Sequence, residues 1–112
     1  MNIYDDVNNL VQNLKKDEKT IKFKEVRDKL INNDKELYEK ILEFQKINIE
    51  INTDELIGKE VDENKKAKSK QIYKELSKNE KALEYFTREV SLNQMIEEVN
   101  KIFMNGIREI YN

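Results

Sequence analysis

Apolar residues recur at intervals of three and four along almost the whole chain, and this spacing predicts helices. The first helix has a single apolar stripe over about four turns, and Asn2 is placed to cap it. Asp17 is placed to cap a second, shorter helix that ends at the cluster of residues 32–34. The stripe of the first helix consists of Tyr4, Val7, Leu10, Val11 and Leu14.

A third helix is predicted from Asn33, because Asn33 and Glu36 have the spacing of a capping box. Residues 47–52 alternate between apolar and polar, which by period alone also permits a strand. We favour the helix, because the three-four repeat continues through this run without a turn signal, and Gly58 then ends the helix or follows it. The repeat consists of Leu37, Ile41, Phe44, Asn48 and Ile51, with Tyr38, Leu42, Gln45 and Ile49 on the adjoining flank.

Two further helices complete the pattern. Asp62 is placed to cap the fourth, which runs to about Lys78 with Ile72, Tyr73 and Leu76 facing inward. Ser77 or Asn79 caps the fifth, whose roughly thirty residues give a length of about 45 Å. Its repeat positions are Ala82, Phe86, Glu89, Asn93, Ile96, Asn100, Phe103, Ile107 and Ile110. The sequence therefore predicts one all-α domain over residues 1–112, with about five helices in an elongated antiparallel bundle and a long C-terminal helix.

The length of the last helix predicts self-association. A compact domain of this size has a radius of gyration of about 13 Å, so a helix of about 45 Å leaves apolar positions that its own chain does not cover. We therefore predict a homodimer or higher homo-oligomer, with two-fold symmetry and pairing through long antiparallel helices. The candidate core or interface anchors are the large apolar residues Phe44, Ile51, Phe86, Ile96 and Phe103.

Four polar residues fall at repeat positions where apolar side chains are expected. They are Asn48, Glu89, Asn93 and Asn100. The favoured interpretation is that the helices are slightly rotated and these side chains lie at a hydrated margin. The alternative is that they pair across helices and set register and partner choice, as a single polar residue does in coiled coils.

The composition excludes most catalytic chemistry. The chain has no Cys, no His, no Trp, no Pro and only two Gly, so the usual general base, thiolate nucleophile and thiolate metal sites are missing. Adjacent carboxylates such as Asp5 and Asp6 diverge by about 100° on a helix and are better explained as surface charge than as metal ligands. We therefore predict no catalytic, cofactor or metal site. The acidic N-terminus and the lack of an apolar run of about 20 residues make the cytoplasm the expected compartment.

Charge is unevenly distributed, although the formal net charge is only -2. Residues 59–81 contain eight lysines against five acidic residues, and the face from Lys65 to Lys81 is the most basic part of the chain. A solvated helix face explains this best, because nucleic-acid-binding modules show a stronger basic excess with interleaved Arg or aromatic residues. Weak RNA binding through this face is the alternative function that remains.

The order and spacing of several short stretches resemble the YlbF/YmcA family of small helical bacterial proteins. The likeness covers nearly the whole chain, and the closing Asn-Lys-Ile and Ile-Tyr are most similar to the YheA branch. The stretches are Asn-Ile-Tyr-Asp at 2–5, Asn-Asp-Lys-Glu at 33–36, residues 44–49 followed by Gly-Lys-Glu-Val at 58–61, and Glu89 through Asn100 to Tyr111.

This resemblance implies a cytoplasmic all-α protein of Firmicutes, usually a dimer or higher oligomer, with a regulatory role and no catalysis. YlbF and YmcA act with a third protein, YaaT, on RNase Y-dependent mRNA processing, and thereby on competence, sporulation and biofilm formation. The family's regulatory members bind an iron–sulfur cluster through cysteines, and this chain has none, so no cofactor is expected. Gly106 stands where the YheA branch tends to have proline, and it permits a bend without forcing one. The resulting hypothesis is a non-enzymatic, homo-oligomeric regulator with an unknown protein partner.

Overall fold

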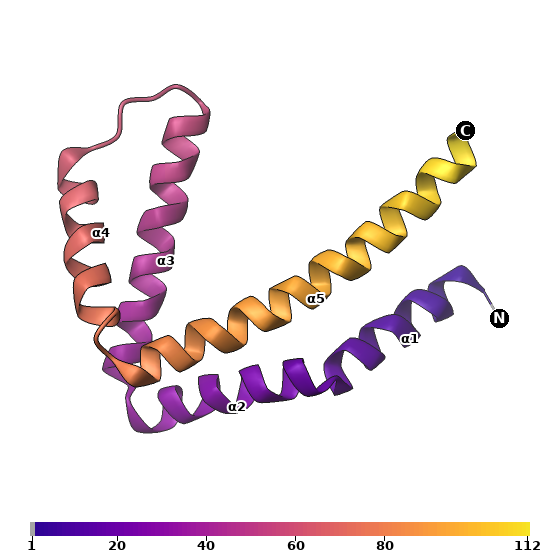
Figure 1. Cartoon of the computed structure of the whole chain (residues 1–112), viewed down its shortest axis with the longest axis horizontal. Helices are drawn as coiled ribbons and strands as arrows, with labels where there is room; N and C mark the ends of the chain where they lie inside the picture. Colours follow the sequence, from indigo (N-terminus) through magenta and orange to yellow (C-terminus); the bar gives the residue numbers. More distant parts are fainter. Residues whose placement is uncertain (1) are drawn as a thin grey trace. The chain divides into compact units, whose positions relative to one another are not determined.

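The computed structural model describes residues 2–112, and the regular secondary structure within them is helical (Figure 1). It confirms the predicted all-α class, the five helices and the long C-terminal helix. At 1.5 Å per residue, the 32 residues of the last helix extend about 48 Å. The helices are α1 (Ile3–Lys16), α2 (Glu18–Asn33), α3 (Lys35–Leu56), α4 (Glu63–Leu76) and α5 (Glu80–Tyr111).

Short polar side chains start the helices, as predicted for most of them. Oδ1 of Asn2 accepts a hydrogen bond from the backbone N–H of Asp5 at 2.9 Å. Asp17, Asp62 and Asn79 cap α2, α4 and α5 in the same way, at 2.8–3.1 Å. Each bond satisfies a backbone donor that has no partner within its own helix.

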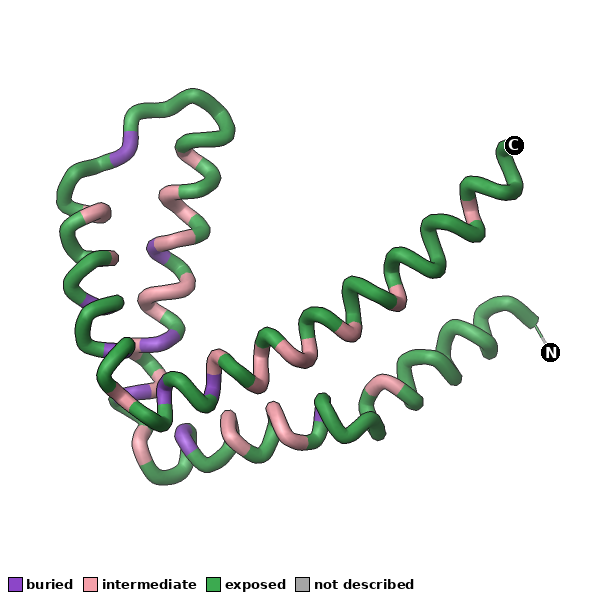
Figure 2. The backbone as a smooth tube through the Cα atoms, in the orientation of Figure 1, coloured by how far each residue is buried: buried purple, intermediate pink, exposed green. Residues whose placement is uncertain are grey.

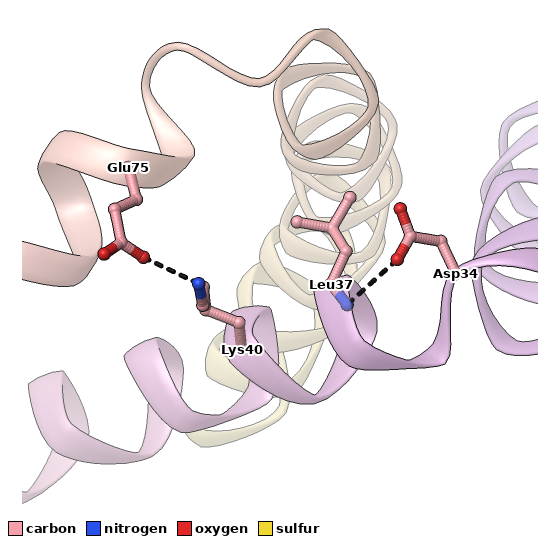
Figure 3. A network of polar contacts seen from close by, with 4 residues as sticks. All are labelled: Asp34, Leu37, Lys40 and Glu75. Atoms are coloured by element: carbon pink, nitrogen blue, oxygen red, sulfur yellow. Dashed lines mark hydrogen bonds and ion pairs between the residues drawn. The ribbon is translucent and has the colours of Figure 1, made fainter.

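Two predicted boundaries need correction. The cap of α3 is Asp34 and not Asn33, because Asn33 completes α2 and the Asp34 carboxylate accepts from the Leu37 N–H at 3.3 Å (Figure 3). A carboxylate is well suited to this place, since the N-terminus of a helix has partial positive charge. Helix α4 ends at Leu76, two residues early, and Ser77 belongs to its C-cap, where its hydroxyl donates to the Lys74 carbonyl.

Gly58 ends α3 with a left-handed turn. Its φ of 75° is one that glycine adopts without a steric penalty. The N–H of Lys59 bonds the Asp54 carbonyl at 2.8 Å, and that of Gly58 bonds the Glu55 carbonyl at 3.2 Å, which together form a Schellman motif. Residues 47–52 are helical, so the helix prediction for that run is confirmed. Helix α5 continues through Gly106 without interruption.

The chain divides into two compact units. The hairpin unit is residues 27–84, in which α3 and α4 pack against each other through the connection at residues 57–62. Ile41 is fully buried, with no exposed surface. The other buried apolar residues of the hairpin unit are Leu30, Leu37, Ile47, Val61, Ile72, Leu76 and Ala82.

The terminal unit is residues 2–26 together with residues 85–112. Its buried centre is small and aromatic: the ring of Tyr85 lies 5.3 Å from that of Phe23 and 5.8 Å from that of Phe86, centroid to centroid. Thr20 is buried beside the α1–α2 junction, where its hydroxyl donates to the Leu14 carbonyl at 2.6 Å. Helix α1 contains no buried residue, as its colouring in Figure 2 shows.

Candidate interaction surfaces

The apolar stripe of α1 is exposed to solvent. Leu14 is half-buried, while Val11 is 40% exposed and Tyr4 78% exposed. The helix is nevertheless well formed, with Asn2 at its cap, acidic residues in its first turn and lysines in its last turn. That placement of charge complements the helix dipole. Helix α1 therefore has all the sequence features of an amphipathic helix but lacks the burial that such a helix needs.

The second half of α5 has the same property. Six of its large apolar side chains, including Phe103 at 57%, have exposed fractions between 39% and 86%. Large apolar patches on a soluble protein mark interaction sites. We call the exposed apolar residues of both helices the terminal apolar surface: Ile3, Tyr4, Val7, Leu10 and Val11 of α1, with Ile96, Ile102, Phe103, Met104, Ile110 and Tyr111 of α5.

The five predicted anchors divide between the two units. Phe44 and Ile51 of the hairpin unit are half-buried, and the Phe44 ring lies 6.2 Å from that of Tyr73 across α3 and α4. Phe86 is half-buried against Tyr85 in the terminal unit. Ile96 and Phe103 are exposed within the chain and belong to the terminal apolar surface. Whether any of the five contacts another subunit stays a prediction.

Of the four polar residues at repeat positions, Asn48 makes contacts that the structure defines. Its side-chain amide donates to the Phe44 carbonyl at 2.9 Å, and its Oδ1 accepts from the Ser69 hydroxyl of α4 at 3.0 Å. Both polar ends of the Asn48 side chain are therefore satisfied, as a half-buried amide requires. Glu89 is half-buried, whereas Asn93 and Asn100 are exposed. Neither the favoured interpretation, a hydrated margin, nor the alternative, a role in register and partner choice across subunits, is tested by these positions.

Carboxylates are interleaved with the lysines of the basic face of α4. Lys65 pairs with Glu50 at 3.2 Å and Lys68 pairs with Glu43 at 2.6 Å, both across the α3–α4 packing, and Lys66 pairs with Glu63 at 3.7 Å. Each carboxylate beside a lysine offsets the charge that a phosphate would need. This arrangement supports the interpretation of the basic face as a solvated and partly paired surface.

One further surface was missed as a unit by the sequence analysis. Leu42, Ile49 and Leu56 of α3 are 42%, 65% and 88% exposed, and seven residues separate each from the next. Seven residues are close to two helical turns, so these side chains lie along one line. We call them the α3 outer stripe. The seven-residue interval was the signal that could have identified it, since Leu42 and Ile49 were assigned only to a flank of the inner repeat.

The resolved electrostatic perturbations come from exposed ion pairs. A hydrogen bond from Lys40 to Glu75 at 2.7 Å, together with the charge of that carboxylate, raises the pKa of Lys40 (Figure 3). Nζ of Lys22 lies 2.8 Å from Oε1 of Glu18, and this hydrogen bond and the lysine's charge lower the pKa of Glu18. The Glu18–Lys22 pair joins neighbouring turns of α2, and the Lys40–Glu75 pair joins α3 to α4. Within residues 2–112, no group of three or more acidic side chains is arranged to hold a metal ion.

A search of the helices of residues 2–112 finds no segment that could span a bilayer.

Comparisons with known proteins agree with the resemblance noted from the sequence. Residues 3–108 match the family described as "Control of competence regulator ComK, YlbF/YmcA". A UPF0342 protein of Lysinibacillus sphaericus is 29% identical over 99% of this chain and 96% of its own length. UPF0342 proteins of Caldicellulosiruptor bescii and Halothermothrix orenii are 30% and 25% identical, over 95% and 96% of this chain and 88% and 90% of their own lengths. These relatives come from Firmicutes. No solved structure is significantly similar to the chain.

Proposed function

The chain belongs to the YlbF/YmcA family, and from that membership we propose that it is a non-enzymatic regulatory protein of the cytoplasm that acts by binding proteins, first of all a second copy of itself. The observation that supports this most strongly is the terminal apolar surface. Eleven large apolar side chains are between 39% and 86% exposed in a chain in which 39% of residues are charged. Such a surface is costly in water and is stabilised when another apolar surface covers it.

The terminal apolar surface contains the residue types that dominate stable interfaces. The set includes Tyr4, Phe103 and Tyr111, and aromatic residues are enriched among the residues that dominate binding energy. A standard stable interface buries about 800 Å² per partner, and exposed apolar residues of this kind supply its buried centre.

A second copy of the chain is the partner that this surface fits best. Helix α1 presents five exposed large apolar residues and the second half of α5 presents six, and a two-fold copy presents the same two sets. Two-fold pairing is the commonest arrangement of soluble oligomers, and it covers the same patch on both subunits. We thus propose that the homodimer expected from the length of α5 forms through the terminal apolar surface.

The regulatory part of the proposal depends on the family and on the chemistry of the chain. A chain without His or Cys has a narrow catalytic repertoire. We propose that the dimer docks a further protein and thereby acts in the control of mRNA processing or of competence, sporulation or biofilm formation. No cofactor enters this proposal, since the chain has no cysteine to hold an iron–sulfur cluster. Assignment to the YheA branch stays a prediction.

Light scattering on three matched proteins tests the dimer. We expect the native chain to have a dimer mass at micromolar concentration and Phe103→Asp to weaken dimerisation by at least about 30-fold, as a central aromatic contact should. Asn105→Asp is the control, because it adds the same charge two residues further on, about 200° around the helix. A folded native monomer, or a Phe103→Asp protein that dimerises as well as the control, contradicts the proposal.

RNA binding through the Lys65–Lys81 face is the competing function, and a filter-binding assay distinguishes it. The proposal expects no RNA affinity that falls steeply as salt rises. A steep fall that is lost on changing Lys70 and Lys74 to Gln would favour RNA instead. These two lysines are suited to the test because both lie on the basic face of α4.

A further inference from the structure

The junction of α1 and α2 is a helix break that the local sequence does not require. We call residues 14–20 the joint. They contain neither Gly nor Pro, and the good helix formers Leu, Lys and Glu occupy five of the seven positions. Within the joint only Asp17 is non-helical, with a φ of -63° and a ψ of 143°, and the axis of α1 turns away from that of α2 there (Figure 1). Interactions of particular side chains must therefore stabilise the break.

Two side chains make the hydrogen bonds that replace helical bonds in the joint. The Asp17 carboxylate accepts from the Lys19 N–H at 2.9 Å, and the Thr20 hydroxyl donates to the Leu14 carbonyl at 2.6 Å. Thr20 is only 8% exposed, so its hydroxyl needs a partner within the protein. Asp and Thr side chains are known to compete with helical backbone bonds by bonding nearby backbone groups.

A continuous helix through the joint would use the same carbonyl differently. In a continuous helix the Leu14 carbonyl accepts from the Glu18 N–H, and the N–H groups of Lys19 and Thr20 bond the carbonyls four residues before them. The continuous arrangement gains these three backbone bonds and loses the two side-chain bonds. Because the two arrangements exchange similar numbers of hydrogen bonds, each of modest net value, they are close in free energy.

The joint determines which way the apolar stripe of α1 faces. Leu14, at the end of the stripe, is half-buried and bonded to Thr20. Thr20 and Phe23 lie three residues apart on one face of α2, where the Phe23 ring contacts that of Tyr85 in α5. In a continuous helix the nine residues from Leu14 to Phe23 would amount to about 900° of rotation, which puts the two side chains on opposite sides. Only the bent joint starts the stripe on the α5 side.

We infer that the joint has two states, and that Asp17 and Thr20 hold it in the bent state seen in the structure. In the bent state the α1 stripe starts on the α5 side of the terminal unit, so it can act together with the α5 part of the terminal apolar surface. In the continuous state the α1 stripe faces the opposite side and that surface is divided. The joint stands by itself, whereas its effect on self-association rests on the dimer proposed above.

NMR spectroscopy of the joint tests the two states directly. In the native chain we expect the Glu18 amide to exchange its hydrogen rapidly, because the first N–H groups of a helix have no helical partner, and Asp17 to have the Cα chemical shift of an extended residue. Thr20→Val removes the donor to the Leu14 carbonyl and keeps the shape of the side chain, so it should move the Asp17 shift toward helical values. Asp17→Ala combined with Thr20→Val should slow Glu18 exchange at least about fivefold.

Asp62→Ala is the matched control for these variants. Asp62 caps α4 through a carboxylate bond to the N–H two residues on, at 2.8 Å, as Asp17 caps α2. The control should leave the Glu18 exchange rate and the Asp17 shift unchanged. If the variants of the joint also leave both unchanged, the joint has a single state and the inference is wrong. If they speed exchange throughout α1, that helix frays instead of joining α2, and the inference is equally wrong.

Light scattering on the same proteins separates the joint from the dimer at the terminal apolar surface. Asp17→Ala combined with Thr20→Val should weaken dimerisation at least about tenfold, and Asp62→Ala should not. If the joint straightens while dimerisation is unchanged, or if the native chain is a monomer, the proposed dimer interface fails and the joint stands. If the amides show no second state while the native chain dimerises, the joint fails and the dimer stands.

Discussion

The hairpin unit and the terminal unit are built from similar amphipathic helices, yet they bury very different amounts of apolar surface. Among the described residues, eight apolar side chains of the hairpin unit are buried, against Tyr85 in the terminal unit. In the hairpin unit a connection of six residues returns α4 along α3, and Val61 within that connection is itself buried. Helix α1 buries nothing. An apolar stripe therefore predicts that a helix must be covered, but not what covers it.

The largest expected effect is a loss of stability on truncating an apolar side chain. Its dependence on protein concentration should differ between the two units. Ile41→Ala should lower the free energy of unfolding by about 2–5 kcal/mol, because a fully buried side chain leaves a cavity. We expect this loss to be the same in dilute and concentrated protein. Leu10→Ala, on the terminal apolar surface, should lower the melting temperature of the proposed dimer by an amount that depends on protein concentration, since the substitution would act on association.

Denaturant and thermal unfolding at two protein concentrations check both variants. An Ile41→Ala effect below about 1 kcal/mol would contradict the assignment of Ile41 to a tightly packed core. A Leu10→Ala effect that is independent of concentration would mean that α1 is covered by its own chain and that the contrast between the units is wrong.

Replacing one asparagine by leucine in each unit should change stability by an intermediate amount. Asn48→Leu should lower the free energy of unfolding by about 1–3 kcal/mol, because it leaves the Ser69 hydroxyl of α4 without its partner. Asn100→Leu should raise the thermal stability of the oligomer and broaden its distribution of masses, if Asn100 sets register across subunits. Calorimetry and light scattering measure the two changes. If both substitutions shift stability in the same direction, the two asparagines do not differ as proposed.

The smallest expected effect is the pH dependence of stability that comes from the exposed ion pairs. This dependence has opposite directions in the two units. The raised pKa of Lys40 in the hairpin unit gives a stabilisation that is complete below its ordinary value of 10.5 and is lost as the pH rises through the raised value. The lowered pKa of Glu18 in the terminal unit gives a stabilisation that is present above 4.5 and is lost as the pH falls through the lowered value.

Thermal unfolding across the pH range measures these contributions. Lys40→Met should remove only the alkaline loss and Glu18→Gln only the acid loss, and salt should weaken both effects because the pairs are exposed. An alkaline loss that persists unchanged in Lys40→Met would assign it to another group.

Much of the fold was predictable because helix signals are local. Asn2, Asp17, Asp62 and Asn79 act as caps through bonds to N–H groups two or three residues away, and the sequence shows both ends of each bond. The error at Asn33 is also local: Asn33 and Asp34 are both good caps, and the choice depends on where α2 stops. The run at 47–52 is helical, as the three-four repeat that continues through it predicted, although its alternation by itself also permitted a strand.

The candidate surfaces were less predictable, because exposure depends on residues far away in the sequence. Phe44 and Phe103 occupy equivalent positions in their repeats, yet one is half-buried near Tyr73 and the other is 57% exposed. The α3 outer stripe is visible as a seven-residue repeat in the sequence. It could be recognised as a surface only after the structure showed that α4 packs on the opposite side of α3.

The sequence by itself determined the helices, most of their caps, the absence of Cys and His and the family to which the chain belongs. All of these depend on residue types and on spacings of a few residues. The tertiary structure decided which apolar stripes are covered within one chain, because burial is a property of pairs of helices brought together by their connections. The apolar stripes of α1, α3 and α5 that remain exposed could be identified only in the folded chain, because their exposure depends on which helices pack against them.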